Sequence, residues 1–323
     1  MEVMILGKIP QSGISLLKSK PDLEVHLVDP SDTGKVNEYI ERVSGIIIRT
    51  SILSADLIRQ ARNLRVVSRF GVGFDNIDVG ELTRSSIPLA VVGENNAVSV
   101  AEHTLYLILA ASKMGIAYDR AVRSGNWGYR ESLMASDLSG KRVLIIGLGR
   151  IGSAVGKLCE AFGLMVSYYD PRPELQGAQA GWERVDDLHS GLASADVVSI
   201  HVPLTPSTRS LISAPEFALM KKSSVIVSTS RGGVVNEVDL ASALESGQIR
   251  AAGLDVFESE PVSVANPLLG LVNAVLSPHM AALSLECAER MAVAAARNCL
   301  DGIEGRLNPA LVVNPKVLTD QRS

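Results

Sequence analysis

The first part of the chain alternates between short apolar runs and longer segments in which apolar residues recur at helical spacing. The short runs are bounded by polar residues, which predicts buried strands, and the longer segments predict amphipathic helices. The predicted strands lie at residues 3–6, 25–28, 45–48, 64–67 and 89–92, and the predicted helices near 14–17, 36–43 and 54–61. Alternation of this kind is typical of a parallel sheet with helices on its faces.

The same alternation resumes after residue 141. Strands are expected at 143–146, 165–169, 197–202, 225–228, 251–256 and 275–277, and helices near 186–192, 214–220 and 238–245. Between the two parts, Ser99 and Glu102 form a capping-box pattern ahead of an apolar run that reaches Met114, so a long helix is expected to begin there. Its apolar residues nearly encircle it, which indicates burial at a domain or subunit boundary. Residues 124–139 are rich in turn formers and predict a linker or an exposed arm.

A last helix is expected at about 285–303, and an apolar tail broken by prolines follows it, LNPALVVNPKVL. Such a tail has to be covered, and the N-terminal sheet is its natural partner. We therefore predict an α/β fold of two Rossmann-like domains, each a doubly wound parallel sheet. One domain is discontinuous and flavodoxin-like, made of residues 1–98 and 286–323, and the other is a Rossmann domain of residues 99–285.

The second alternation opens with KRVLIIGLGRIG, a strand that runs into three glycines and then a helix. Gly147 permits the tight turn, Gly149 lets the backbone approach a pyrophosphate, and Gly152 lets helix and strand pack closely. The exposed N–H groups of the first helical turn favour phosphate there. A glycine motif alone often marks only a turn. The flanking strands and helix make a dinucleotide site the better interpretation.

Asp170 ends the strand that follows this helix, close to the spacing of about 20 residues expected for a ribose-binding acid. Its carboxylate accepts hydrogen bonds from ribose hydroxyls and repels a 2′-phosphate, which favours NAD over NADP. Arg172 leaves NADP open, because an arginine there can receive that phosphate; its alternative role is that of a solvated loop charge.

Composition is that of an ordinary globular protein, with 46% hydrophobic and 20% charged residues. The net charge of −4 gives no electrostatic footprint for nucleic acid or an anionic membrane surface. Cys159, Cys287 and Cys299 lack metal-binding spacing and are expected to be buried thiols of a reduced compartment. The N-terminus reads as a strand and not a signal peptide, and no run is long enough to span a membrane. We therefore expect a cytoplasmic protein.

Three later stretches place polar side chains directly after predicted strands, at the sheet edge where the glycine loop also lies. They hold Arg231 in STSRGG, Asp255 and Glu260 in DVFESEP, and His279 in SPHMA. Taken singly, Arg231 can be read as a surface charge, Glu260 as a solvated acid and His279 as a packed or capping histidine.

Together these residues supply what oxidation of a 2-hydroxy acid requires. The guanidinium of Arg231 can hold a carboxylate and a carbonyl in a planar two-point contact. Proton transfer near neutral pH suits the histidine side chain, so His279 is the candidate to move a proton, and Glu260 can fix its tautomer and favour its protonated form. Asp255 is a candidate for binding the nicotinamide carboxamide.

At these residues the chain resembles the D-isomer-specific 2-hydroxyacid dehydrogenases, in particular their phosphoglycerate dehydrogenase-like branch. The matching motifs cover nearly the whole length: SRFGVGFDNID, NAVSVAEH, LIIGLGRIG with Asp170, HVPLTPST, STSRGGVVNE, LDVFESEP and SPHMAAL. Ser228 departs from the family, which usually has Asn there, but this change removes no catalytic group.

The resemblance implies that the discontinuous domain binds substrate, that the domain between its two parts binds NAD, and that Arg231, Glu260 and His279 are catalytic. The residues expected to bind NAD are Gly147, Gly149, Arg150, Ile151, Gly152, Asp170, Val202, Thr229 and Asp255. The turn of Gly71, Val72 and Gly73 is expected to present backbone N–H groups to the substrate carboxylate.

Arg49 and Arg69 end two strands of the first domain. Two arginines there would suit a substrate with a second anion, such as phosphate or sulfonate, and in phosphoglycerate dehydrogenase-like enzymes matching positions hold the phosphate. The alternative is that either arginine pairs with a nearby acid, such as Asp75 or Glu102.

The leading hypothesis is an NAD-dependent oxidoreductase that interconverts a small 2-hydroxy acid with a second anion, such as 3-phosphoglycerate, and its 2-keto acid. The alternatives are a glyoxylate or hydroxypyruvate reductase and a non-catalytic, NAD(H)-sensing binding protein. The long apolar helix suggests a homodimer, in which Arg130 of the arm could reach a neighbouring subunit. His103 and His201 are expected to be structural and satisfied locally, and no metal site is expected.

Overall fold

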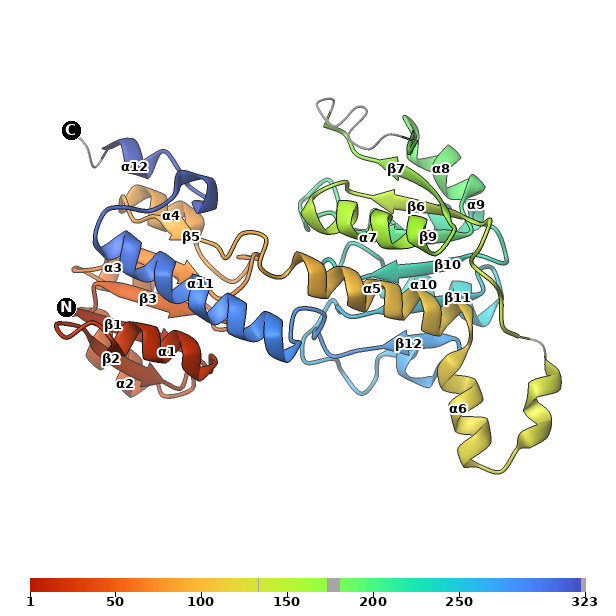
Figure 1. The fold of residues 1–323 in the computed structure, drawn as a ribbon, viewed down its shortest axis with the longest axis horizontal. Coiled ribbons are helices and arrows are strands. Elements are labelled where there is room, and N and C mark those ends of the chain that lie inside the picture. Colours follow the sequence, from red (N-terminus) through yellow and green to blue (C-terminus); the bar gives the residue numbers. More distant parts are fainter. Residues whose placement is uncertain (133, 173–180, 321–323) are drawn as a thin grey trace. The chain divides into compact units, whose positions relative to one another are not determined.

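The computed structural model describes residues 1–132, 134–172 and 181–320. The chain divides into two compact units, one made of Met1–Asn96 with Leu283–Ser323 and the other of Ala97–Ala282. These bounds lie within three residues of the predicted ones. The first unit is therefore built from both ends of the chain (Figure 1).

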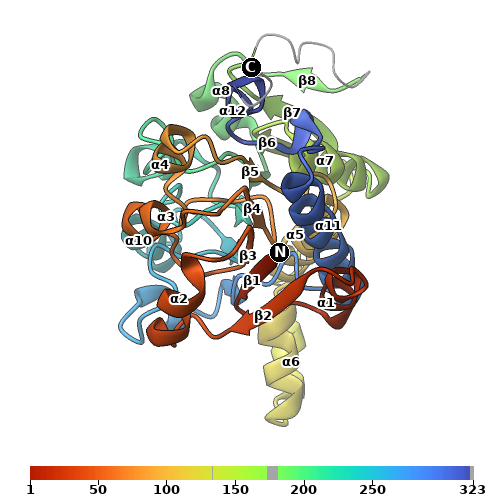
Figure 2. The same cartoon turned by 90° about the vertical axis from the view of Figure 1, so that its left-hand side faces the viewer.

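The first unit contains a five-stranded parallel sheet in the order β2-β1-β3-β4-β5, the flavodoxin-like order. Its strands are β1 (Glu2–Leu6), β2 (Glu24–Val28), β3 (Gly45–Ile48), β4 (Val66–Arg69) and β5 (Leu89–Ala90). Its helices are α1 (Gln11–Lys18), α2 (Thr33–Ile40), α3 (Ala55–Gln60), α4 (Val79–Arg84), α11 (Leu285–Ile303), η4 (Pro309–Leu311) and α12 (Val317–Asp320). In Figure 2, α1 and α11 cover one face of this sheet and α2, α3 and α4 the other.

The C-terminal segment completes the first unit. Helix α11 approaches β3 so closely that a Cβ at Gly45 would lie 2.6 Å from the sulfur of Cys299. The apolar tail then covers the edge strand β5, because the N–H of Val313 donates to Leu89 O at 2.9 Å. The side chain of Asn314 accepts from Leu89 N and donates to Ile87 O, each at 2.9 Å. The tail is therefore covered by the N-terminal sheet, as its composition predicts.

The second unit contains a seven-stranded parallel sheet in the order β12-β11-β10-β9-β6-β7-β8, the Rossmann order extended by one strand. Its strands are β6 (Arg142–Ile146), β7 (Met165–Tyr169), β8 (Glu183–Arg184), β9 (Val197–Ile200), β10 (Val225–Ser228), β11 (Ala251–Leu254) and β12 (Ala274–Leu276). Its helices are α5 (Ala97–Ser112), α6 (Gly115–Arg123), η1 (Trp127–Ser132), α7 (Arg150–Ala161), α8 (Leu188–Ser194), α9 (Ala214–Leu219), α10 (Glu237–Glu245) and η3 (Pro267–Gly270).

The strands of this second sheet are buried on both faces, which is why they read as continuous apolar runs. In β6, Val143 and Ile145 pack into the core under α5 and α7, whereas Leu144 and Ile146 pack into the core under α8, α9 and α10. The two predicted doubly wound parallel sheets are thus confirmed.

Three local predictions differ from the structure. Helix α5 begins at Ala97, so Ser99 lies inside its first turn and does not cap it. The left-handed backbone of Met114, with φ 52°, separates α5 from α6, which was not predicted. Strand β8 was also missed, because two polar residues at a sheet edge carry no apolar signal. Among the described residues, no helix is long and apolar enough to cross a membrane.

Candidate active site

The glycine loop joins β6 to α7 and leaves room for a ligand at the helix N-terminus. Gly147 has φ +94°, and a Cβ there would lie 2.9 Å from the carbonyl carbon of His201. A Cβ at Gly152 would lie 2.1 Å from Gly147 O, whereas one at Gly149 would meet nothing within 4 Å. No side chain caps α7 at Gly149. Its first turn therefore fits the pyrophosphate of a dinucleotide.

Asp170 directly follows β7 and is only 4% exposed. Its Oδ2 accepts the N–H of Leu148 in the glycine loop at 2.8 Å, which ties the two strand ends together. Burial raises the pKa of Asp170, but the hydrogen bonds from Arg172 and from Leu148 outweigh burial and hold the pKa below its usual value. The carboxylate is therefore ionised at neutral pH, as a ribose acceptor should be.

The other predicted NAD contacts lie on elements around this loop. Arg150 and Ile151 begin α7, the former exposed and the latter half-buried. The Cγ1 of Val202, after β9, would lie 2.9 Å from a Cβ at Gly147. Thr229, after β10, is buried, and its Oγ1 lies 2.9 Å from that of a threonine of α5. Each individual contact with NAD stays a prediction.

Asp255 follows β11, and its fully buried carboxylate holds the turn that carries His279. Oδ1 accepts from Ser277 Oγ at 2.6 Å and from Met280 N at 2.9 Å, and Oδ2 accepts from Ala281 N at 2.8 Å. The predicted contact of Asp255 with the nicotinamide carboxamide stays a prediction. In this structure its carboxylate shapes the histidine turn.

His279 and Glu260 form a direct pair, with Nδ1 and Oε2 2.6 Å apart. The other carboxylate oxygen of Glu260 accepts the N–H of Phe257 at 3.0 Å. Burial raises the pKa of Glu260, but the hydrogen bonds from His279 and Phe257, together with the charge of Arg231, lower it below its usual value. An ionised Glu260 holds the proton on Nδ1 of His279, which leaves Nε2 for chemistry.

Arg231 lies close enough for its charge to lower the pKa of Glu260. It follows β10, and its Nη1 donates to Ser230 O at 2.6 Å. The next residue, Gly232, packs on the loop that carries Glu260, since a Cβ there would lie 1.8 Å from Phe257 O. The structure therefore brings together all three residues that were predicted to be catalytic, from three separate strand ends.

The predicted substrate residues of the first unit form a braced turn. Arg69 donates from Nε to Gly73 O at 2.6 Å, and from Nη1 to Phe70 O at 3.0 Å and Ile48 O at 3.3 Å. Gly71 has φ +141°, a conformation that favours glycine. Arg69 therefore stabilises the Gly71–Val72–Gly73 turn through backbone carbonyls.

Arg49 is held differently. Its Nη1 donates to Lys8 O at 3.2 Å, and its guanidinium carbon lies 5.8 Å from the centre of the Phe70 ring. Backbone carbonyls thus accept hydrogen bonds from both arginines, and Arg49 also lies against an aromatic ring. The contact of either arginine with a second anion stays a prediction.

Two further histidines have defined partners. His201 bonds locally, with Nε2 2.8 Å from Ser199 Oγ, and burial lowers its pKa to about 3. The hydrogen bond of His103 is not local, since its Nε2 lies 2.8 Å from the Oγ of Ser277, 174 residues away. Nothing in the local sequence signals this contact, and sequence reasoning missed it.

Sequence spacing also missed a cluster on the first sheet. The possible ligand atoms of Glu2, Glu24 and His26 lie within 4.8 Å of one another on the neighbouring strands β1 and β2. Oε2 of Glu2 already accepts from His26 at 2.9 Å and from Arg42 at 3.2 Å. These contacts form an ion-pair network without requiring a metal.

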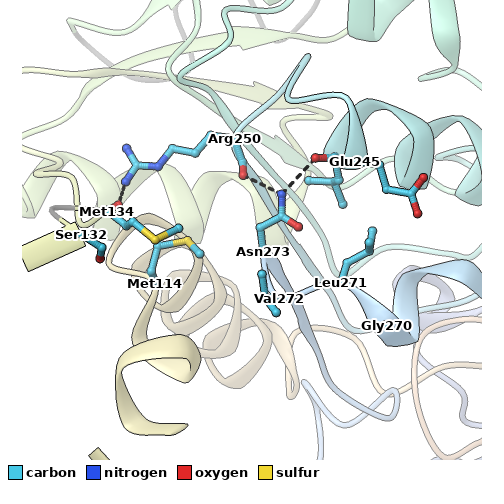
Figure 3. A pocket seen from close by; sticks show the side chains of 10 residues that line it. Met114, Ser132, Met134, Glu245, Arg250, Gly270, Leu271, Val272 and Asn273 are labelled. Atoms are coloured by element: carbon cyan, nitrogen blue, oxygen red, sulfur yellow. Dashed lines mark hydrogen bonds between the residues drawn. The ribbon is translucent and has the colours of Figure 1, made fainter. Parts of the chain in front are cut away.

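A separate hollow of about 540 Å³ lies beside the starts of β11 and β12 (Figure 3). Asn273 spans its wall, donating to Arg250 O at 3.1 Å and Leu244 O at 3.3 Å. Because the predicted catalytic residues follow strand ends, this hollow at strand starts contains none of them.

The comparisons with known proteins agree with this geometry. Residues 105–281 match the family model described as "D-isomer specific 2-hydroxyacid dehydrogenase, NAD binding domain". The chain is 36% identical to the glyoxylate reductase of Thermofilum pendens, over 98% of this chain and 95% of the relative. It is 37% identical to the D-3-phosphoglycerate dehydrogenase of Archaeoglobus fulgidus, over 88% of this chain but only 54% of the relative. The chain thus spans about half the length of that relative.

A solved structure, that of the TT0316 protein of Thermus thermophilus, is similar with a TM-score of 0.87 and 31% identity, over 97% of this chain and 100% of that one. The second unit is the NAD-binding domain of its family, so the predicted cofactor is confirmed. The chain belongs to the D-isomer specific 2-hydroxyacid dehydrogenase family.

Proposed function

We propose that the chain is an NAD-dependent dehydrogenase that interconverts a small 2-hydroxy acid bearing a second anion and its 2-keto acid. The observation that carries this proposal is the 2.6 Å contact between Nδ1 of His279 and Oε2 of Glu260, beside the charge of Arg231. A titrating imidazole, a tuning carboxylate and a guanidinium for a carboxylate and carbonyl are the groups that this reaction needs.

His279 handles the proton of the substrate hydroxyl. Its Nδ1 is occupied by Glu260, so Nε2 accepts the hydroxyl proton on oxidation and returns it on reduction. The ionised carboxylate of Glu260 stabilises the imidazolium that results. The glycine loop would hold NAD, which would supply the hydride acceptor for oxidation, or the donor for reduction, at C2 of the acid. Arg231 orients the carboxylate and the carbonyl of the acid, and Gly71, Val72 and Gly73 are proposed to bind the same carboxylate through N–H groups.

A glyoxylate or hydroxypyruvate reductase is the second candidate. The hydrogen bonds from Arg69 to backbone carbonyls favour this second candidate, because an arginine that stabilises a turn is less available to a second anion of the substrate. A chain that binds NADH without turnover would instead be an NAD(H)-sensing protein.

Turnover measurements separate these three functions. Oxidation of 3-phosphoglycerate, sulfolactate and glycerate with NAD, and reduction of glyoxylate and hydroxypyruvate with NADH, are compared as kcat/KM. We expect the highest value for one of the two doubly anionic acids. Preference for glycerate, glyoxylate or hydroxypyruvate would select the second candidate. Tight NADH binding with no turnover of any acid would contradict both enzymes.

We also propose a cytoplasmic homodimer. Helix α5 exposes Val98 and Tyr106, and the segment after it exposes Val122 and Trp127, with 48–69% of each residue accessible. Large exposed apolar side chains are typical of an interface between subunits. Light scattering should give twice the chain mass of 34.3 kDa, and a Trp127→Glu substitution should shift it toward the monomer.

A further inference from the structure

His103 of α5 contacts two residues that directly follow strands of the second sheet, Asp255 after β11 and Ser277 after β12. Its Nε2 lies 2.8 Å from Ser277 Oγ and 3.5 Å from Asp255 Oδ1. Its side chain is only 13% exposed, and the ring of Tyr106 lies against it at 5.5 Å between centroids. The imidazole is therefore held in one place, beside a buried carboxylate.

The direction of the hydrogen bonds follows from the number of protons available. The carboxylate of Asp255 can only accept, and Ser277 Oγ lies 2.6 Å from its Oδ1, so the single hydroxyl proton of Ser277 is used there. Ser277 Oγ must then accept from Nε2 of His103, which carries a proton in consequence. His103 is thus the donor at the head of a relay that runs through Ser277 to Asp255.

At the other end of this chain of hydrogen bonds, Asp255 holds the turn that contains His279. Asp255 accepts the N–H groups of Met280 and Ala281, and its own carbonyl accepts the N–H of His279 at 2.8 Å. His279 adopts a left-handed backbone with φ 50°, which a residue other than glycine rarely holds without support. The Asp255 carboxylate is that support, so its rotamer fixes where the imidazole of His279 lies.

We propose that His103 is a positioning residue for His279. By donating through Ser277 it fixes the rotamer of Asp255, and the Asp255 carboxylate then holds the strained turn of Met280 and Ala281. No step of the reaction passes through His103 itself. The kinetic part of this inference rests on the proposed dehydrogenase function, whereas its structural part does not.

Amide hydrogen exchange on the full chain tests the structural part without any substrate. In His103→Ala the relay loses its first donor, so the amides of Met280 and Ala281 should exchange about tenfold faster or more. His103→Gln keeps an amide N–H at similar reach and should restore most of the protection. The control His189→Ala removes a 59% exposed histidine of α8 and should leave both amides unchanged. Unaltered exchange in His103→Ala would overturn the inference.

Steady-state kinetics test the consequence for His279. A small displacement of a catalytic group lowers kcat strongly, so His103→Ala should lower it about ten- to a hundredfold while the NADH Kd stays within about threefold. His103→Gln should recover activity to within about threefold of wild type. Ser277→Ala should behave like His103→Ala, and the double variant should be no worse than either, because the two residues act in series.

Hydrogen exchange and kinetics together distinguish failure of the positioning role from failure of the proposed function. Faster exchange together with an unchanged kcat would contradict a positioning role, as would equal losses in His103→Ala and His103→Gln. If the wild-type chain turned over no acid, the proposed function would fail, and the exchange measurement would still decide whether His103 orders the turn.

Discussion

Arg172 forms a two-point pair with Asp170, with Nε 2.9 Å from Oδ1 and Nη2 2.8 Å from Oδ2. The backbone N–H of Arg172 also donates to Oδ1 at 3.0 Å. If Asp170 accepts the ribose hydroxyls of NAD, as predicted, those hydroxyls compete with this arginine for its carboxylate. Arg172 is thus paired with Asp170 although 50% of its side chain is exposed, and we propose that it takes part in the choice between NAD and NADP.

Replacing Arg172 should sharpen the preference for NADH. In Arg172→Leu, the lone pairs of Asp170 become free for ribose hydroxyls, and the guanidinium that could bind a 2′-phosphate is lost. We expect the ratio of the NADPH Kd to the NADH Kd to rise about tenfold, measured by fluorescence titration. Arg123→Leu, the same charge change at an exposed site of α6, should leave the ratio unaltered. A fall in the ratio would mean that Arg172 opposes NADPH binding instead of assisting it.

Arg69 and Arg49 should respond differently to the same substitution. Because Arg69 donates to three backbone carbonyls, Arg69→Gln should lower the unfolding free energy by about 1–3 kcal/mol and raise KM for every acid. Arg49→Gln should cost less than about 1 kcal/mol and raise KM only for acids with a second anion. Urea unfolding and KM for 3-phosphoglycerate and glycerate check both. A purely substrate-selective effect of Arg69→Gln would show that the turn does not need its bonds.

His201 should make the fold sensitive to acid. Burial lowers its folded pKa to about 3, whereas an unfolded histidine titrates near 6.5. Below about pH 6.5 the unfolded chain therefore binds a proton that the folded chain does not, and stability falls as pH falls, by at most about 1.4 kcal/mol per unit.

Urea unfolding at several pH values between 7 and 5, for wild type and His201→Gln, measures this contribution. The free energy of unfolding should decline less steeply in the variant, since glutamine does not titrate. Equal slopes in the two proteins would show that His201 protonates as easily in the folded state as in the unfolded one.

Much of the fold could be predicted because buried parallel strands appear in the sequence as continuous apolar runs. The strand–glycine–helix–strand order around Gly147 and Asp170 identified the nucleotide half, and the uncovered apolar tail pointed to its place on β5. The start of α6 was not predictable, because it depends on one left-handed residue, Met114, with no special sequence. Edge strand β8 lacks the apolar signal altogether.

The meeting of Arg231, Glu260 and His279 was predictable for a similar reason, because side chains that follow parallel strands lie at one edge of the sheet, whereas their catalytic role stays a prediction. Long-range contacts were not, because the sequence around His103 says nothing of Ser277, 174 residues away. The pairing of Arg172 with Asp170 was equally hidden, since a loop arginine has the same sequence signature whether it is solvated or paired. The position of a side chain that follows from sheet topology can be predicted from the sequence, whereas a contact that depends on a side-chain rotamer is seen only in the structure.

His279, tuned by Glu260, is proposed to transfer the substrate proton. The most direct test is kcat for keto-acid reduction in His279→Gln, measured together with the NADH Kd. Glutamine keeps a hydrogen-bonding group but cannot exchange a proton near neutrality, so kcat should fall by about 10²- to 10⁴-fold while the NADH Kd stays within about threefold. A variant that keeps more than about a tenth of wild-type kcat would contradict proton transfer by His279.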